Sequence, residues 1–368
     1  MTDIFDEFVA AIDDPAKIDV LAPTLRYAKI KPTNNCNSRC ITCSYWEHKY
    51  TNELTLEEIY DTLHVFRELG IEEVMFTGGE PTLRKDLIDM VDEAKNQGFS
   101  GIGITTNSLS LKEKKLDSLV AAGLTEVVLS LEGCETHDEI RGVAGNFKKV
   151  KKNLEHLAKI KAEAKKSGPS VKIATTVMNR TISQIDGVLA LARQYNATLL
   201  LNLIDNGTYF FEGMSKDLFT LHDRTTFNQM IDGLIETKRQ EPGLIGNSMS
   251  SLEYARRYFD DPKQADIPCY LGYIGCEVDA DGSVFSNCWG LAALGNIRKT
   301  PLKEILSSEK YRQRCADMYR KKCGGCSCGY VLNLSYHPPS VAEDSKENPE
   351  FSRVKLGYAG EKAIKANV

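Results

Sequence analysis

The sequence contains no long apolar run, no cationic leader and no cluster of basic residues. In its 368 residues, no hydrophobic stretch approaches the roughly 18 residues that a membrane-spanning helix needs. The N-terminal stretch MTDIFDEFVAAIDDP is acidic and lacks the positive start of a secretory signal. The formal net charge is −5, which argues against a general nucleic-acid binder. We therefore expect a cytoplasmic protein that binds neither membranes nor nucleic acid.

Cysteine, by contrast, is abundant in an otherwise ordinary composition. Hydrophobic residues make up 42% of the chain and charged residues 26%, as in a typical globular protein. The length suits one large domain with a smaller one beside it. Eleven cysteines in a chain without a secretory signal indicate metal or redox chemistry and not a disulfide framework.

Short β-branched segments alternate with amphipathic helical patterns over the first 200 residues. One helix should begin at Thr55, where Glu58 completes a capping box, and should end at Gly70. Six strand–helix units in succession predict an α/β fold with a parallel sheet and right-handed crossovers. The predicted strands cover residues 26–31, 73–77, 101–105, 126–131, 172–177 and 198–203.

Three cysteines, Cys36, Cys40 and Cys43, follow the first predicted strand with the spacing Cys-x3-Cys-x2-Cys. An iron–sulfur cube normally takes four thiolates, so three on one loop leave one iron open to another ligand. The alternative is a structural zinc site, which prefers four nitrogen or sulfur ligands, often in Cys-x2-Cys pairs. Only His48 lies nearby to complete such a site, so the spacing favours a cube.

Polar or glycine-rich motifs follow the next three predicted strands. Gly78-Gly79-Glu80 comes after the second strand, Asn107 after the third, and Ser130-Leu131-Glu132-Gly133 after the fourth, followed by a His-Asp-Glu-Ile-Arg-Gly run that contains Arg141. The carboxyl ends of parallel strands meet at one mouth of a barrel. We therefore expect these motifs to lie around the cysteine loop.

The cysteine loop CNSRCITC and these motifs together resemble the radical S-adenosylmethionine (SAM) superfamily. The resemblance implies a partial (β/α)6 TIM-like barrel and a [4Fe–4S] cluster whose open iron binds the amino and carboxylate groups of SAM. An electron, supplied by a flavodoxin- or ferredoxin-type donor, would cleave SAM to a 5′-deoxyadenosyl radical that abstracts a substrate hydrogen. One departure is Thr42, which stands where the family usually has an aromatic residue.

The resemblance also implies roles for individual residues. Gly78, Gly79 and Glu80 would hold the amino group of SAM, and Asn107 its ribose or methionine end. Ser130 and Arg141 would bind the carboxylate, because a guanidinium suits bidentate carboxylate binding. The alternative for Arg141 is a salt bridge to Glu139 or Asp138 that merely orders the loop.

The C-terminal third holds a second group of cysteines. A hairpin is predicted over residues 278–285 with its turn at Asp281-Gly282, and a helix over 301–311. The pattern resembles the SPASM/twitch extension of radical SAM enzymes, although a zinc ribbon shares such a composition. The cysteines of this region are Cys269, Cys276, Cys288, Cys315, Cys323, Cys326 and Cys328.

The SPASM/twitch resemblance implies auxiliary [4Fe–4S] ligation. Its expected ligands are Cys276, Cys288, Cys323 and Cys326, with Cys269 and Cys328 able to join or replace one of them. Cys315, on a predicted helix, is the cysteine least suited to this role. The shortened run Cys323–Cys326–Cys328 favours one auxiliary cluster over two. The expected organisation is an N-terminal segment (1–24), a barrel (25–240), a linker (241–268), the auxiliary-cluster domain (269–331) and a tail (332–368).

The expected function is C–H activation by a radical SAM oxidoreductase or epimerase. The main hypothesis is the oxidation, crosslinking or epimerisation of a peptide. The alternative is the dehydrogenation or epimerisation of an amino sugar, aminocyclitol or nucleoside, and a non-catalytic electron carrier would leave the open iron unexplained. Cys134, which follows Gly133, is a candidate hydrogen donor, or simply a small packing residue. The aromatic, acidic loop 205–212 is a candidate substrate contact.

Overall fold

A single curved sheet contains both the barrel strands and the C-terminal hairpin. The computed structural model describes residues 17–323, apart from 48, 164–167, 205–215, 262–267 and 289. The strand order is β6-β5-β4-β3-β2-β1-β7-β8-β9, parallel from β6 to β7 and antiparallel from β7 to β9. The strands are β1 (Tyr27–Thr33), β2 (Glu73–Gly78), β3 (Gly101–Thr106), β4 (Glu126–Ser130), β5 (Ser170–Val177), β6 (Thr198–Leu203), β7 (Gly275–Val278), β8 (Ser283–Phe285) and β9 (Gly295–Asn296).

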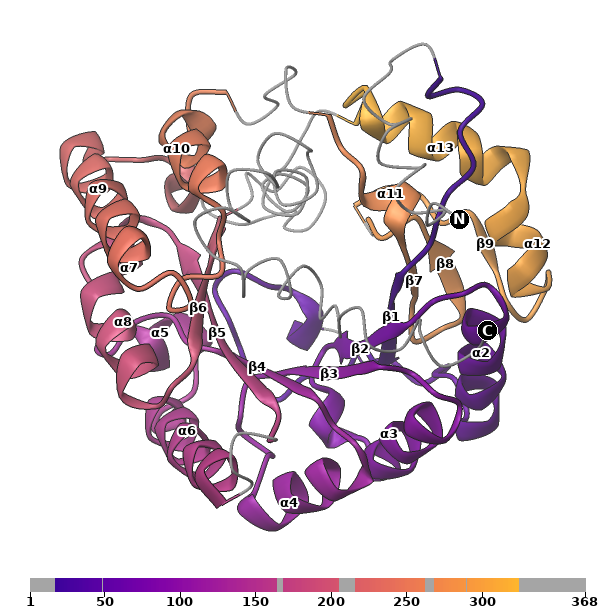
Figure 1. Ribbon diagram of the computed structural model, residues 1–368, viewed down its shortest axis with the longest axis horizontal. Helices are drawn as coiled ribbons and strands as arrows, with labels where there is room; N and C mark the ends of the chain where they lie inside the picture. Colours follow the sequence, from indigo (N-terminus) through magenta and orange to yellow (C-terminus); the bar gives the residue numbers. More distant parts are fainter. Residues whose placement is uncertain are drawn as a thin grey trace, which may run out of the picture.

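Helices cover the convex side of this sheet, as Figure 1 shows for α3, α4, α6 and α8. The α-helices are α2 (Leu56–Glu68), α3 (Leu87–Asn96), α4 (Glu113–Ala122), α5 (His137–Arg141), α6 (Asn146–Glu163), α7 (Asn179–Ile182), α8 (Ile185–Gln194), α9 (Arg224–Gln240), α10 (Met249–Tyr258), α11 (Leu271–Ile274), α12 (Leu302–Ser307) and α13 (Glu309–Tyr319). Short 3-10 helices lie at η1 (Tyr45–Glu47), η2 (Pro81–Leu83) and η3 (Lys216–Phe219). Within the described residues, no helix is long and apolar enough to cross a membrane.

The predicted α/β fold with a partial barrel is confirmed. Each of the six predicted strands is present, and its ends fall within two residues of the prediction. Alternate positions such as Ile30 on β1 and Phe76 on β2 are fully buried in the main hydrophobic core with the helices. The positions between them therefore face the inside of the barrel, since side chains alternate across a strand.

The C-terminal hairpin is joined directly to the barrel. Strand β7 pairs in parallel with β1, so that Lys29 lies opposite Glu277. The Lys31 ammonium lies 2.7 Å from a Glu277 carboxylate oxygen and 2.8 Å from one of Asp279, and it donates to the Tyr45 hydroxyl at 3.0 Å. The side chains of Lys31 and Glu277 are only 4% and 1% exposed. This buried ion-pair network ties the hairpin to the start of the barrel.

Two segments differ from the sequence-based expectation. The segment 241–268, expected as a linker, contains α10, and its Ile245 forms a parallel bridge with Leu199 beside β6. The helix expected over 301–311 is two helices, α12 and α13. They are separated at Ser308, whose hydroxyl accepts a hydrogen bond from the Tyr311 amide at 3.1 Å and so starts a new helix.

The start of α2 yields a testable pH dependence. The predicted capping box between Thr55 and Glu58 is present, and Arg298 clamps both Glu58 oxygens at 2.6 and 2.8 Å. The hydrogen bond from Arg298, then that of the Thr55 amide, lowers the pKa of Glu58 from 4.5 to about 2. A lowered carboxyl pKa stabilises the fold above pH 4.5, and this contribution is lost as the pH falls towards 2.

We expect Glu58→Gln to lower the free energy of unfolding by about 1 kcal/mol at pH 7, because the pair is partly exposed. The difference from wild type should shrink steadily between pH 4.5 and pH 2 in urea titrations. The neighbouring, exposed Glu57→Gln is the matched control and should change little. An equal loss for Glu58→Gln at pH 7 and near pH 2 would contradict the ion-pair explanation.

Candidate functional site

The cysteine loop lies at the mouth of the barrel and is held by the end of α5. The Arg39 and Ile41 amides each donate to a carbonyl of this helix, those of Arg141 and Ile140, at 2.9 Å. The Trp46 indole N–H donates to the Cys40 carbonyl at 3.2 Å. Cys40 is 6% exposed, and these backbone hydrogen bonds attach its loop to the barrel.

The three thiols influence one another electrostatically. Burial is the main cause that raises the pKa of Cys36 and Cys43, the latter to about 11, and the charge on neighbouring thiols raises both further. The Arg141 guanidinium acts in the opposite direction on both. Thiols that lie beside a cation and raise one another's pKa fit a metal cluster that replaces their protons.

The loop must still adjust to bind a cluster. Among the described residues, no three cysteine, histidine or acidic side chains already stand together as a finished metal site. His48, the residue that could have completed a zinc site, lies outside the described residues.

Gly78 and Gly79 bring the end of β2 against the cysteine loop. A Cβ atom on Gly78 would lie 2.4 Å from the Thr33 carbonyl oxygen, and one on Gly79 would lie 2.2 Å from that of Asn35. The φ angle of Gly78 is +115°, which a larger side chain rarely adopts. The two glycines therefore allow the end of β2 to approach the backbone that leads into the cysteine loop. From the sequence alone, they were expected to lie close to SAM.

Glu80 and Asn107 are committed to hydrogen bonds inside the protein. The Glu80 carboxylate is 1% exposed and accepts from the Thr106 hydroxyl at 2.8 Å and the Asn107 amide at 2.7 Å. The Asn107 side chain donates to Asn37 at 2.8 Å and to Ser38 at 2.9 Å. Both side chains therefore brace the loop that carries the cysteines, and their direct contact with SAM stays a prediction.

Arg141 lies beside the cysteine loop with a partner that sequence reasoning missed. Its guanidinium donates to Glu132 at 2.7 Å and lies 3.7 Å from the Cys40 sulfur. The alternative pairing with Glu139 is wrong, since Glu139 pairs with Arg180. Glu132 belongs to the Ser-Leu-Glu-Gly run, and its negative charge was the feature of the sequence that could have indicated it as the partner of Arg141. Ser130 is half-buried at the end of β4, as expected for a residue at the mouth.

Four of the described C-terminal cysteines fall into two environments. Cys269 lies in a small apolar cluster with Leu271 and Met318, against which Cys288 packs. Cys315 lies near the same cluster, because a Cβ placed on Gly272 would lie 3.0 Å from its sulfur and 3.3 Å from that of Met318. Burial, and then the charge of Cys269, raises the pKa of Cys315. Cys276 lies instead in the main hydrophobic core on β7, fully buried.

This arrangement changes the expected ligand set of the auxiliary site. Cys276 sits at a core position opposite Ala28, which speaks against its role as a ligand. Cys269 and Cys288 come together, and Cys315, which was set aside, lies close to Cys269. Cys323 is half-buried just after α13, whereas Cys326 and Cys328 lie outside the described residues.

Cys134 faces the helical layer and not the inside of the barrel. Its sulfur would lie 3.0 Å from a Cβ placed on Gly187 of α8. After burial, the groups that shift its pKa are Glu135 and Lys151 of the α6 helix. Since α6 and α8 cover the convex side of the sheet (Figure 1), the structure favours the packing role over that of hydrogen donor.

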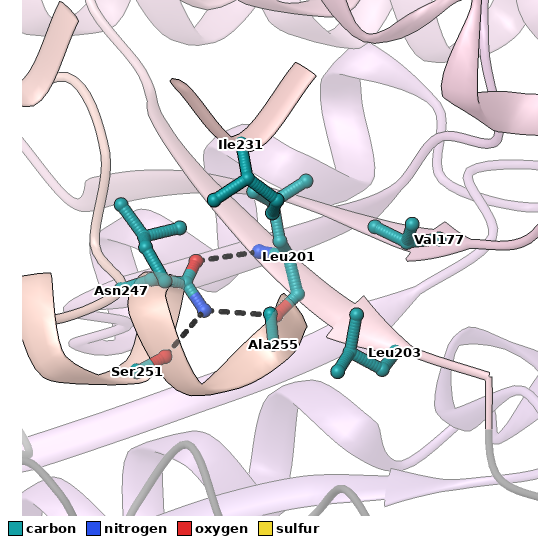
Figure 2. Close-up of a pocket in the computed structure, with 8 residues that line it drawn as sticks. Val177, Leu201, Leu203, Ile231, Asn247, Ser251 and Ala255 are labelled. Atoms are coloured by element: carbon teal, nitrogen blue, oxygen red, sulfur yellow. Dashed lines mark hydrogen bonds between the residues drawn. The ribbon is translucent and has the colours of Figure 1, made fainter. Parts of the chain in front are cut away.

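A small apolar pocket lies elsewhere, between the last barrel strands and α9 and α10. Its lining includes Val177, Leu203 and Ile231. Figure 2 shows Asn247 in its wall, where the amide bonds the Leu201 backbone at 2.8 and 2.9 Å and caps the edge of β6. The lining has no thiol or charged group, so we assign it to packing. The candidate substrate loop 205–212 lies outside the described residues.

Two regions of this chain match models of known families. The model of the radical SAM superfamily matches residues 30–192, and that of the SPASM iron–sulfur cluster-binding domain matches residues 269–328. The AdoMet-dependent heme synthase of Oleidesulfovibrio alaskensis is 24% identical over 338 residues, which cover 86% of this chain and 84% of that protein.

Two further comparisons concern part of the sequence and the fold. The GTP 3′,8-cyclase of Aquifex aeolicus is 32% identical over 195 residues, which cover 51% of this chain and 58% of that protein. The structure of SuiB from Streptococcus suis bound to its precursor peptide SuiA has a TM-score of 0.62 at 14% identity, covering 89% of this chain and 74% of that one. This likeness concerns the fold.

Proposed function

Because this chain belongs to the radical SAM superfamily and ends in a SPASM iron–sulfur cluster-binding region, we propose that it oxidises, crosslinks or epimerises a peptide. It is an enzyme that uses SAM, a SAM-bound [4Fe–4S] cluster and auxiliary iron–sulfur clusters. When bound, the first cluster supplies the electron for reductive cleavage of SAM to a 5′-deoxyadenosyl radical. A flavodoxin- or ferredoxin-type protein is the proposed donor of that electron.

The chain's own residues would then hold and orient SAM. Cys36, Cys40 and Cys43 would ligate the cluster and leave one iron for SAM. The Arg141 guanidinium and the Ser130 hydroxyl would face the SAM carboxylate, since both lie at the mouth. Backbone atoms of the glycine-rich turn would take the amino group.

For the auxiliary site, we place one cluster on Cys269, Cys288, Cys323 and Cys326. The shared environment of Cys269 and Cys288 supports this set. Cys328 remains the alternative fourth ligand.

The proposal of a peptide substrate is supported by the charged side chains on the inner face of the barrel. It presents Lys29 from β1, Glu126 from β4 and Lys172 from β5, and the last two form a salt bridge of 2.5 Å. Burial, and then the charge of Glu126, raises the pKa of Glu73 to about 9, so that Glu73 is protonated at neutral pH. A lumen with both signs of charge suits the polar backbone and mixed side chains of a peptide better than a flat apolar molecule.

A second candidate is synthesis of heme from an iron tetrapyrrole. It is favoured by the heme synthase, which matches over most of both chains. The lumen lysines Lys29 and Lys172 could bind the carboxylates that such a molecule carries.

The test compares substrate classes with one readout. The reconstituted enzyme, SAM and a reductant are incubated with a pool of synthetic peptides, with an iron tetrapyrrole carrying carboxylates, or with GTP. We expect peptides to raise 5′-deoxyadenosine formation several-fold above the substrate-free rate. Mass spectrometry should show a peptide that has lost two hydrogens or, in deuterated water, gained one deuteron.

The lumen provides a matched variant for this comparison. Lys172→Met should weaken a peptide's stimulation while the substrate-free cleavage of SAM stays unchanged. Stimulation by the tetrapyrrole or by GTP alone, with no response to peptides, would overturn the peptide proposal and leave the radical SAM chemistry intact.

A further inference from the structure

Two fully buried polar residues lie behind the cysteine loop without a role in the chemistry described so far. His137 begins α5 and Asn146 begins α6, and both side chains are 0% exposed. Buried polar groups are costly unless they are hydrogen-bonded, so each must have partners that justify its place in the core. Each of the two side chains has a hydrogen-bond partner at both of its polar atoms.

The hydrogen bonds between them have one consistent direction. The Glu132 amide N–H can only donate, so His137 Nδ1, 3.0 Å away, accepts. His137 Nε2 must then carry the proton in the neutral ring and donates to Asn146 Oδ1 at 3.0 Å. This orients the Asn146 amide so that its nitrogen donates to the Asn107 carbonyl at 2.8 Å. Burial, and then the Arg141 charge, lowers the pKa of His137 to about 4, which keeps the ring neutral.

Each end of this chain of bonds continues to a different cysteine. From Asn107, the side-chain amide donates to Ser38 at 2.9 Å and lies 3.8 Å from the Cys36 sulfur. From Glu132, the carboxylate accepts from Arg141 at 2.7 Å, and the Arg141 guanidinium lies 3.7 Å from the Cys40 sulfur. This chain of hydrogen bonds, called the relay below, therefore connects the part of the loop near Cys36 with the part near Cys40 through buried residues.

We infer that His137 and Asn146 are positioning residues of the SAM site. They hold Asn107, which braces the loop near Cys36, at a set distance from the Glu132–Arg141 pair beside Cys40. Arg141 is the residue that would bind the SAM carboxylate, and a guanidinium binds bidentately only within a narrow range of orientations. A shift at His137 would thus reach the cofactor through Glu132 and Arg141 without any direct contact.

Packing alone does not require this arrangement. An apolar pair of similar volume would fill the same space, but it would leave the Glu132 amide and the Asn107 carbonyl without these hydrogen-bond partners. The hydrogen bonds that join Glu132, His137, Asn146 and Asn107 restrict this part of the fold to one geometry, which is the property that a ligand-binding loop needs.

The experiment uses the reconstituted holoenzyme and three variants. His137→Phe and Asn146→Leu remove the relay while keeping much of the volume. The control is His156→Phe on the same helix α6, where the imidazole bonds only the partly exposed Asp117 at 2.6 Å on the convex side. The readouts are the Kd for SAM by calorimetry, the electron paramagnetic resonance spectrum of the reduced cluster with and without SAM, iron content and Tm.

We expect His137→Phe and Asn146→Leu to raise the Kd for SAM about tenfold, the scale of an unsatisfied buried hydrogen-bonding group. The spectral change that SAM causes in the reduced cluster should weaken, while iron content stays near that of wild type. The control should keep the wild-type Kd and spectrum. A lower Tm with an unchanged Kd and spectrum in the folded, iron-loaded variants would show a packing role only and overturn the proposal.

A gentler variant covers the case in which those proteins do not fold. Asn146→Asp keeps the acceptor that faces His137 but replaces the donor to the Asn107 carbonyl with a second acceptor. The repulsion should displace Asn107 and raise the Kd for SAM in the same direction. A wild-type Kd for Asn146→Asp would also overturn the proposal.

Discussion

Replacing Cys36, Cys40 and Cys43 together by alanine is expected to abolish SAM cleavage and to remove one cluster from the protein. These cysteines follow β1 directly, and backbone hydrogen bonds to the end of α5 hold their loop at the mouth of the barrel. With one auxiliary cluster, the wild type should hold about eight irons after anaerobic reconstitution, and the triple variant about four. Iron analysis and the assay of 5′-deoxyadenosine formation measure both effects.

The matched control is Cys134→Ala, which removes a thiol against Gly187 of α8, on the convex side of the sheet. It should keep all of the iron and the full rate of SAM cleavage. About twelve irons in the wild type would mean two auxiliary clusters. Residual SAM cleavage by the triple variant would contradict the assignment of these three cysteines.

The largest loss of stability is expected from Lys31→Met. Lys31 is buried between Glu277 and Asp279 at 2.7 and 2.8 Å, and its removal leaves two carboxylates facing each other in the interior. Breaking a buried ion pair from one side costs about 3–5 kcal/mol. We expect a loss of this size in the free energy of unfolding, measured by chemical denaturation. The hairpin should also loosen from β1, because the network joins β7 to the barrel.

A rescue variant separates the charge effect from packing. Lys31→Met combined with Glu277→Gln and Asp279→Asn removes all three charges and should recover much of the lost stability. The control Lys29→Met, on the same strand, loses only a longer contact of 3.9 Å at a more exposed site and should cost far less. If the triple variant were no more stable than Lys31→Met, the loss would have to come from packing and not from unpaired charge.

The barrel strands were predictable because their information is local. In each βα unit, the spacing of apolar residues changes from a period of 2 in the strand to 3.6 in the helix. Capping and turn residues mark the ends of the helix, as at Thr55, Glu58 and Gly70. The cysteine spacing is local as well. The structure confirmed the strands, and the radical SAM model matched the region that contains the cysteine loop. The joint of α12 and α13 was missed because Ser308 starts a new helix within an otherwise helical pattern.

The partners of the site residues were not predictable, because they come from distant parts of the chain. Glu80 was expected to bind a ligand, yet it is buried against Thr106 and Asn107, which follow another strand. Arg141 was expected to bind the SAM carboxylate, with a salt bridge to Glu139 or Asp138 as the alternative, and its observed partner is Glu132, nine positions earlier. Sequence spacing cannot rank such partners, since the choice depends on side-chain directions after packing.

The sequence by itself thus determined the class of fold and the cysteine loop, since both rest on periodicity and spacing within short segments. Only the tertiary structure decided which cysteines share an environment. Cys276 and Cys288 flank one hairpin, yet the parallel pairing of β7 with β1 places Cys276 in the core opposite Ala28. Cys269, from before the hairpin, then packs with Cys288 and Met318. The pairing of strands far apart in the sequence sets which face each side chain takes, and no local pattern carries that information.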